Sequence, residues 1–188
     1  MARPKSEDRR RAILESATHI VATEGLTATT AEIAKQAGVS NGSLFVYFDT
    51  KADLMNALFI SLKAEMVAAA SDGVDYQADA RIQTLRIWNQ WLDWAVAFPE
   101  KRRALSQLDV SDDITAESHR VAGEDFAGIA AMLDRGRAHG PMKDASLGFV
   151  LALMTSVAET TIDAIISDPS HADETRALAF DALWRMIA

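Results

Sequence analysis

The chain has 188 residues, 49% of them apolar and 24% charged, which is typical of a globular protein with a hydrophobic core. It has no cysteine, so disulfides, thiol catalysis and thiolate-bound metals are excluded. No apolar run reaches the roughly 18 residues of a membrane span, and the N-terminus lacks an apolar signal region. We therefore expect a cytoplasmic protein without a membrane partner.

The formal net charge of -8 is distributed unevenly along the chain. Residues 1–51 carry seven Lys/Arg against six Asp/Glu, whereas residues 52–188 carry twelve against twenty-one. The cationic side chains gather at the start: Arg3, Lys5, Arg9, Arg10 and Arg11. Because screening limits each charge to a reach of about 10 Å, a local basic patch can bind phosphates on an acidic molecule. A solvated tail explains the same run equally well.

Helix is predicted for nearly all of the chain, because Gly and Pro stand at the joints and no period-2 alternation is sustained. Ser6 is expected to cap a first helix, which ends at Gly25. Residues 29–32 form a capping box, Thr-Thr-Ala-Glu, and open a short second helix that stops at Gly38.

A third helix is predicted from Ser40, its cap, to about Phe48, and a fourth from the cap at Thr50 to about Ala70. Five further helices are expected over 77–97, 101–109, 114–138, 145–167 and 171–187. The sequence therefore predicts an all-α fold of about nine helices.

The second and third helices, joined by a turn with glycine, match the helix-turn-helix geometry that inserts a helix into the major groove. Leu44 and Phe48, four residues apart, are expected to face inward. The outer face then carries small hydroxyls, an amide and a phenol but no acid: Ser40, Asn41, Ser43 and Tyr47, with Phe45 nearby. Such a surface suits close approach to a polyanion, and Lys51 begins the next helix, where its ammonium can reach a phosphate.

Residues 30–54, TAEIAKQAGVSNGSLFVYFDTKADL, resemble the N-terminal domain of TetR-family transcriptional regulators, and residues 13–17 and 25–30 fit the same family. The resemblance covers about the first quarter of the chain. It implies a three-helix DNA-binding domain over 1–51 and a helical effector-binding and dimerisation domain over 52–188. It also implies a cytoplasmic, ligand-responsive repressor that binds double-stranded DNA at a palindromic operator as a homodimer, with no enzyme activity, cofactor or metal.

Carried over by position, the resemblance implies these DNA-contacting residues: Thr29, Thr30, Ser40, Asn41, Gly42, Ser43, Phe45, Tyr47 and Lys51. Gly42 would allow the backbone to approach closely, and Tyr47 and Lys51 would hold phosphates. The family commonly has tyrosine where this chain has Phe45, so an apolar contact, for example with a thymine methyl, replaces a hydrogen bond. The alternative is that these residues only cap and pack the helices. It accounts for Thr29 and Ser40 in part but not for the whole set.

An aromatic stripe at 87–98 includes three tryptophans in seven positions, which are hard to pack without gaps. Plain core explains any single member, but aromatics, methionines and one inward polar group also describe a small-molecule pocket. In the predicted helix over 114–138, His119 and Phe126 share a face. For residues 52–188 the resemblance to the TetR family implies a hydrophobic or aromatic effector. The candidate ligand-binding residues are Phe59, Met66, Trp88, Trp91, His119 and Phe126.

The last two predicted helices have wide apolar faces, which either complete the monomer or pair with a second copy as a four-helix bundle. The resemblance favours the pairing. The predicted dimer interface consists of Met154, Val157, Thr161, Ile165, Phe180, Leu183, Trp184 and Ile187. A twofold dimer would hold two recognition helices about one DNA turn, or roughly 34 Å, apart.

Two other classes of protein compete with a DNA-binding regulator. An enzyme is disfavoured because we find no catalytic residues: no phosphate loop, nucleophile elbow or His-Glu-x-x-His pattern is present. The acids between residues 112 and 125 favour a solvated surface over a cation site. A protein-interaction module that has lost DNA binding is disfavoured by the intact 29–51 segment, although Phe45 keeps that alternative open.

Overall fold

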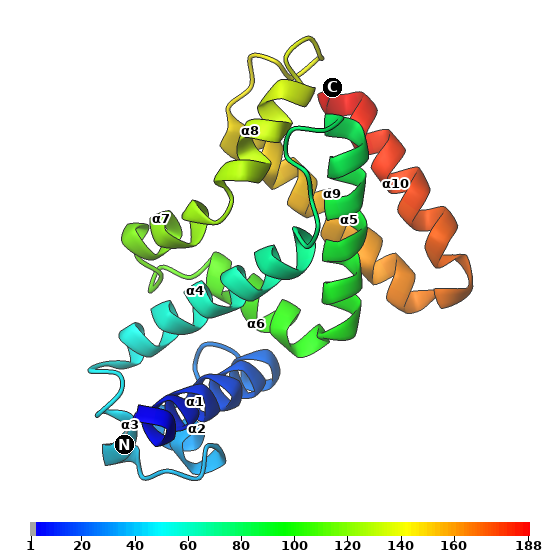
Figure 1. Ribbon diagram of the computed structural model, residues 1–188. Coiled ribbons are helices and arrows are strands. Elements are labelled where there is room, and N and C mark those ends of the chain that lie inside the picture. Colours follow the sequence, from blue (N-terminus) through cyan, green and yellow to red (C-terminus); the bar gives the residue numbers. More distant parts are fainter. Residues whose placement is uncertain (1–2) are drawn as a thin grey trace. The chain divides into compact units, whose positions relative to one another are not determined.

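The computed structural model describes residues 3–188, with side chains from Ser6 onward (Figure 1). The side chains of Arg3 and Lys5, part of the predicted basic patch, lie outside the described ones. The described residues form an all-α fold without strands. Its elements are α1 (Arg3–Glu24), α2 (Thr30–Gln36), α3 (Asn41–Leu44), α4 (Lys51–Ala70), α5 (Ala80–Ala97), α6 (Pro99–Asp109), α7 (Ala116–Glu124), α8 (Ala127–Gly136), α9 (Leu147–Ser167), the short 3-10 helix η1 (Pro169–His171) and α10 (Ala172–Ile187).

The first helix starts earlier than expected and ends where expected. Because α1 begins at Arg3, Ser6 lies inside the helix, and the prediction that it caps the helix is wrong. Pro4 is compatible with this early start, since the first turn of a helix does not use the N–H that proline lacks. At the other end Gly25 takes a φ of 84°, and its N–H donates to the Val21 carbonyl at 3.0 Å.

The prediction of a single helix over 114–138 is also wrong, because α7 and α8 are separate helices with a turn at Asp125 and Phe126. Gly123 lowers the helix propensity just before this turn. Acids at 124 and 125 are unfavourable at the C-terminal end of α7 but favourable ahead of α8, because of the helix dipole. His119 and Phe126 therefore belong to different elements and do not share a helix face.

The described residues divide into two compact units. Unit 1 comprises residues 3–65 and 98–123, and unit 2 comprises residues 66–97 and 124–188. Helices α6 and α7 thus join the N-terminal helices in unit 1, although they lie far along the chain. The predicted domain boundary after residue 51 divides the chain by expected role, with DNA binding before it and effector binding and dimerisation after it. This boundary stays a prediction.

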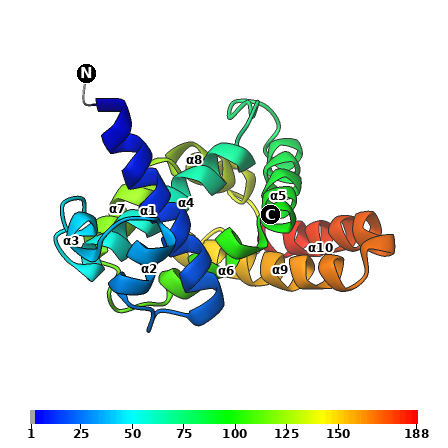
Figure 2. The ribbon, with the colours of Figure 1, turned by 90° about the horizontal axis from the view of Figure 1, so that it is seen from below.

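Helix α1 is the central support of unit 1. Its apolar face, with Ile13, Ala17 and Val21 fully buried, packs against α2 and α6. Figure 2 shows α2 beside α1 and α3 beside α2. Two polar contacts fasten α1 to α6: the Gln107 amide donates to the Val21 carbonyl at 3.1 Å, and the His19 ring nitrogen Nδ1 lies 3.1 Å from the Glu100 carboxylate. The support under the helix-turn-helix is therefore itself held by α6.

Unit 2 is built from α5, α8, α9 and α10, and α9 and α10 run side by side in both views (Figures 1 and 2). Its aromatic core joins α5 to α10. Trp88 is 1% exposed, its indole N–H donates to the Arg176 carbonyl at 3.3 Å, and its ring lies 6.3 Å from that of Phe180. Trp184 stacks on Phe180 at 6.1 Å, and a Cβ added at Gly136 of α8 would come within 2.9 Å of Trp184.

By length and composition, α9 is the one helix of the described residues that is apolar enough to cross a membrane. A third of its most apolar window is buried inside the chain, and its neighbour α10 covers part of it. A core helix passes the same test, so this finding is weak support for a membrane span.

Arg137 fastens the turn that leads into α9, and its loss should destabilise unit 2. Its guanidinium is nearly buried, pairs with Asp134 at 2.7 Å and donates to the carbonyls of Met142 at 2.6 Å and Ala145 at 2.7 Å. We expect Arg137→Met to lower the free energy of unfolding by about 2–4 kcal/mol, because the nearly buried hydrogen bonds of the guanidinium to both carbonyls are lost. Urea denaturation followed by tryptophan fluorescence measures this loss.

The matched control is Arg120→Met, since Arg120 pairs with Glu117 at 2.6 Å on the surface of α7. Exposed ion pairs contribute about 0–1 kcal/mol, so this variant should unfold nearly like the wild type. Equal losses in the two variants would contradict the role assigned to Arg137.

Candidate nucleic-acid interface

The predicted capping box at the start of α2 is confirmed. The Thr29 hydroxyl accepts from the Glu32 N–H at 3.2 Å and donates to the Glu32 carboxylate at 2.6 Å, and the Thr29 N–H donates to the same carboxylate at 2.8 Å. These hydrogen bonds, the hydroxyl first, hold the pKa of Glu32 below its ordinary value of 4.5. The box sets where α2 begins, and both of its side chains are exposed.

Thr29→Ala is expected to lower stability by about 1 kcal/mol at neutral pH, as loss of an N-cap does. The folded-state pKa of Glu32 is lowered, so its contribution to stability is present above 4.5 and is lost as the pH falls through the folded value. The gap between wild type and variant should therefore shrink from pH 7 to pH values well below 4.5. Urea titrations at both pH values test this, and a gap independent of pH would contradict it.

The turn after α2 and the start of α3 follow the predicted pattern. Gly38 takes a φ of 68°, which a residue with a side chain rarely adopts, and the Val39 N–H donates to the Ala34 carbonyl at 3.0 Å. The Ser40 hydroxyl caps α3 by accepting from the Ser43 N–H at 3.1 Å, and the two serine hydroxyls lie 2.8 Å apart. These contacts orient the start of α3.

Helix α3 ends at Leu44, so the prediction that it runs to Phe48 is wrong. The chain continues as tighter turns, in which the Val46 N–H donates to the Ser43 carbonyl at 3.2 Å and the Tyr47 N–H to the Leu44 carbonyl at 2.9 Å. Aromatic and β-branched residues at 45–48 have low helix propensity. Leu44 and Phe48 are both buried, as expected, and the Arg10 guanidinium lies 5.3 Å from the Phe48 ring centre.

The outer surface of α3, defined here as residues 40–43 together with 45–47, is largely open to solvent. Ser40, Asn41, Gly42 and Ser43 are exposed side by side, Phe45 is 40% exposed and Tyr47 is half-buried. Thr30, at the start of α2, is also half-buried. The surface holds no acid, so nothing on it repels a phosphate backbone. The chemistry it offers is hydrogen bonding and apolar contact at short range.

Two features of this region were not predicted from the sequence: a hydrogen bond of Lys51 and the exposure of Val46. The Lys51 ammonium donates to the Leu26 carbonyl at 2.6 Å, which fastens the start of α4 to the loop between α1 and α2. Its predicted contact with a phosphate stays a prediction. Val46 was not predicted to contact DNA, but it is 80% exposed. Its place midway between the inward Leu44 and Phe48 is the signal that would have identified it.

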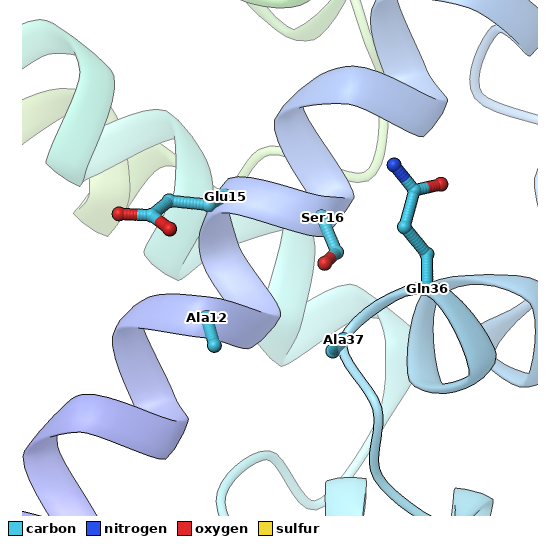
Figure 3. Close-up of a pocket in the computed structure, with 5 residues that line it drawn as sticks. All are labelled: Ala12, Glu15, Ser16, Gln36 and Ala37. Atoms are coloured by element: carbon cyan, nitrogen blue, oxygen red, sulfur yellow. The ribbon is translucent and has the colours of Figure 1, made fainter.

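A hollow of about 350 Å³ lies between α1 and the end of α2 (Figure 3). Its lining residues are Ala12, Glu15, Ser16, Gln36 and Ala37. Figure 3 shows that the Glu15 and Gln36 side chains do not converge on a common point. None of the predicted ligand-binding residues lines this hollow.

The predicted ligand-binding residues fall into both units. In unit 1 Phe59 is buried and its ring meets that of His119 edge-on at 4.9 Å, but His119 itself is exposed. In unit 2 Met66 and Trp88 are buried, while Trp91 and Phe126 are half-buried. Trp88 is 1% exposed, and its ring lies 6.3 Å from that of Phe180. An effector site at these residues stays a prediction.

The predicted dimer interface is mostly buried within one chain. The buried members are Met154, Thr161, Ile165, Phe180, Leu183 and Ile187, whereas Val157 and Trp184 are half-buried. The physical reason is that α9 and α10 pack on each other and on α5, which uses the apolar stripes inside unit 2. Exposed apolar side chains on the same two helices are Phe149, Ile166 and Leu178.

Comparison with known proteins agrees with this geometry. Residues 13–58 match the family described as "Bacterial regulatory proteins, tetR family". The structure is similar to a TetR-family transcription regulator from Marinobacter aquaeolei VT8, with a TM-score of 0.85 and 24% identity, covering 99% of this chain and 98% of that one. It is also similar to FadR from Bacillus subtilis in complex with stearoyl-CoA, with a TM-score of 0.67 and 17% identity, covering 95% and 97%.

A relative by sequence is the nucleoid occlusion factor SlmA of Vibrio vulnificus strain YJ016, 28% identical over 123 residues. The match covers 64% of this chain and 61% of that protein. The similarity therefore spans less than two thirds of the relative.

An all-α fold in which a first helix supports a helix-turn-helix is typical of bacterial DNA-binding regulators. Residues 13–58 thus carry the sequence pattern of the tetR-family model, and the fold of the chain is similar to that of a solved TetR-family regulator.

Proposed function

We propose that the chain is a transcriptional repressor that binds a palindromic operator as a homodimer and is released by a hydrophobic or aromatic small molecule. The observation that carries the DNA-binding part is the outer surface of α3. It is acid-free and exposed, while Leu44 and Phe48 anchor its other side in unit 1. The proposed place of action is the cytoplasm, where the DNA is.

Residues at both ends of this surface suit contact with DNA. Ser40, Asn41 and Ser43 offer hydrogen-bond donors and acceptors for phosphates and base edges. Thr29 and Thr30 lie at the start of α2, which contacts α3. Tyr47 and Lys51 are proposed as phosphate contacts. Lys51 has further ammonium hydrogens beyond the one that it donates to Leu26.

Salt-dependent binding to the DNA upstream of the chain's own gene tests this proposal. Fluorescence anisotropy between 50 and 200 mM salt should give a linear fall of log affinity with log salt, as expected when phosphates are neutralised. An unrelated duplex of equal length is the control. Absence of binding, or binding without salt dependence, would favour the interaction module instead.

The homodimer part of the proposal concerns the surface of α9 and α10 that the chain leaves uncovered. Since the inner stripes are used within unit 2, a second copy would meet the outer faces, where Phe149, Ile166 and Leu178 are exposed. Light scattering of the full chain gives the mass in solution. A monomeric mass at micromolar concentration would contradict the dimer.

The effector part is supported by aromatic side chains in both units, with half-buried Trp91 and Phe126 as the accessible ones of the predicted set. The FadR of similar fold holds stearoyl-CoA, so a long apolar ligand is one class to test. We propose that binding changes the direction of α4 from Lys51 onward, with a coupling free energy of about 1–3 kcal/mol per site. Native mass spectrometry of the purified chain identifies a co-purifying molecule.

Nucleoid occlusion is a second candidate function, favoured by the similarity to the Vibrio protein. A repressor occupies few sites near the genes that it controls, whereas a nucleoid occlusion factor is expected at many chromosomal sites. Mapping of the chain on the chromosome by immunoprecipitation distinguishes the two.

A further inference from the structure

Phe45 and Val46 are two consecutive large apolar side chains that the fold leaves outside the core. Val46 is 80% exposed and Phe45 is 40% exposed, while Leu44 and Phe48 on either side are buried. Within the described residues no other two exposed large apolar residues are neighbours in sequence. The pair lies on the outer surface of α3.

Val46 projects from the side of the segment that faces away from the core. It lies midway between Leu44 and Phe48, which are four residues apart and both point inward. One turn before it are Gly42 and Ser43, and a Cβ added at Gly42 would meet no atom within 4 Å. Val46 therefore extends the open surface that begins at Ser40.

An isopropyl group neither donates nor accepts hydrogen bonds, so phosphates and polar base edges offer it no partner. The major groove presents one apolar base feature, the 5-methyl group of thymine. A β-branched side chain also loses little rotamer freedom on contact, because its χ1 is already restricted. We propose that Val46 contacts the methyl group of a thymine in each operator half-site and so selects thymine there. This inference rests on the proposed function, binding of DNA through α3.

The test uses a duplex selected from a random pool by the full-length chain, in which each thymine is replaced in turn by deoxyuridine. The replacement removes only the methyl group. We expect one position per half-site at which it weakens binding about fourfold, the effect of one buried methyl or methylene group. Val46→Ala should bind the unmodified duplex about fourfold more weakly per half-site and should not distinguish thymine from deoxyuridine at that position.

Val110→Ala is the matched control, because Val110 is 84% exposed and lies outside the helix-turn-helix. It should keep the wild-type affinity and the wild-type response to deoxyuridine. Since Val46 is exposed, Val46→Ala should also keep the helical circular dichroism of the wild type.

Two results would overturn the inference while leaving the proposed function intact. One is a selected duplex whose binding is indifferent to every deoxyuridine. The other is sensitivity that persists in Val46→Ala or disappears only in Phe45→Ala. Failure to select any duplex would instead refute the proposed function, and this inference with it.

Discussion

Gly42→Ala is expected to weaken binding to the selected duplex by about 10- to 100-fold while leaving the chain folded. In the free chain a Cβ at this position meets no atom within 4 Å, so the variant loses no packing. Alanine also favours a helix over glycine by about 1 kcal/mol, so the free energy of unfolding should stay equal or rise. If the α3 backbone approaches the base edges, the added methyl displaces it. Disturbed base contacts cost about 1–3 kcal/mol at each site.

Gly123→Ala is the matched control for this prediction, because Gly123 also lies in a helix of unit 1 with no atom within 4 Å of an added Cβ. It should leave DNA affinity unchanged. Anisotropy titrations give the affinity and urea denaturation gives the stability. If Gly42→Ala binds DNA as tightly as the wild type, the proposed close approach of α3 is wrong.

Trp88→Ala is expected to lower the free energy of unfolding of unit 2 by about 3–5 kcal/mol, the usual cost of deleting a fully buried tryptophan. Trp88 is 1% exposed, lies beside Phe180 and donates to the Arg176 carbonyl, so its replacement leaves a cavity and removes this hydrogen bond. Urea or thermal denaturation measures the change.

Trp91→Ala on the same helix is the comparison, since Trp91 is half-buried and lies 6.3 Å from Trp88 between ring centres. Its loss should cost less, about 1–2 kcal/mol, because less apolar area is buried. If Trp91 contacts the effector, this variant should also weaken ligand-induced release from DNA. Similar stability losses in the two variants would contradict the assignment of Trp88 to the core.

The elements near the outer surface of α3 were predictable because short-range contacts define them. The box of Thr29 with Glu32, the cap by Ser40 and the positive φ at Gly25 and Gly38 each involve residues within about four positions of one another. Spacing in the sequence reports such contacts directly. The helix-turn-helix and the family resemblance rest on the same local pattern.

Other features depend on which distant segment covers a given face, and spacing says nothing about that. The apolar stripes of α9 and α10 were expected either to complete the monomer or to pair with a second copy, and most of their residues are buried within one chain, where α9 and α10 pack on each other. Pairing through these residues stays a prediction. Trp88 was a candidate pocket residue, and its ring is buried 6.3 Å from that of Phe180, which lies far along the chain. Its part in an effector site stays a prediction. Lys51 was expected to reach a phosphate, and its ammonium also donates to the Leu26 carbonyl, a contact between distant parts of the sequence.

The amino-acid pattern was sufficient to predict the all-α class and the residues at which α2, α3 and α4 begin. It was also sufficient to predict the residues that surround the proposed DNA contact. Only the tertiary structure decided that α6 belongs with α1 and that the helix expected over 114–138 is broken. The reason is that caps and turns are satisfied within a few residues, whereas an apolar surface is satisfied by whichever partner excludes water from it best.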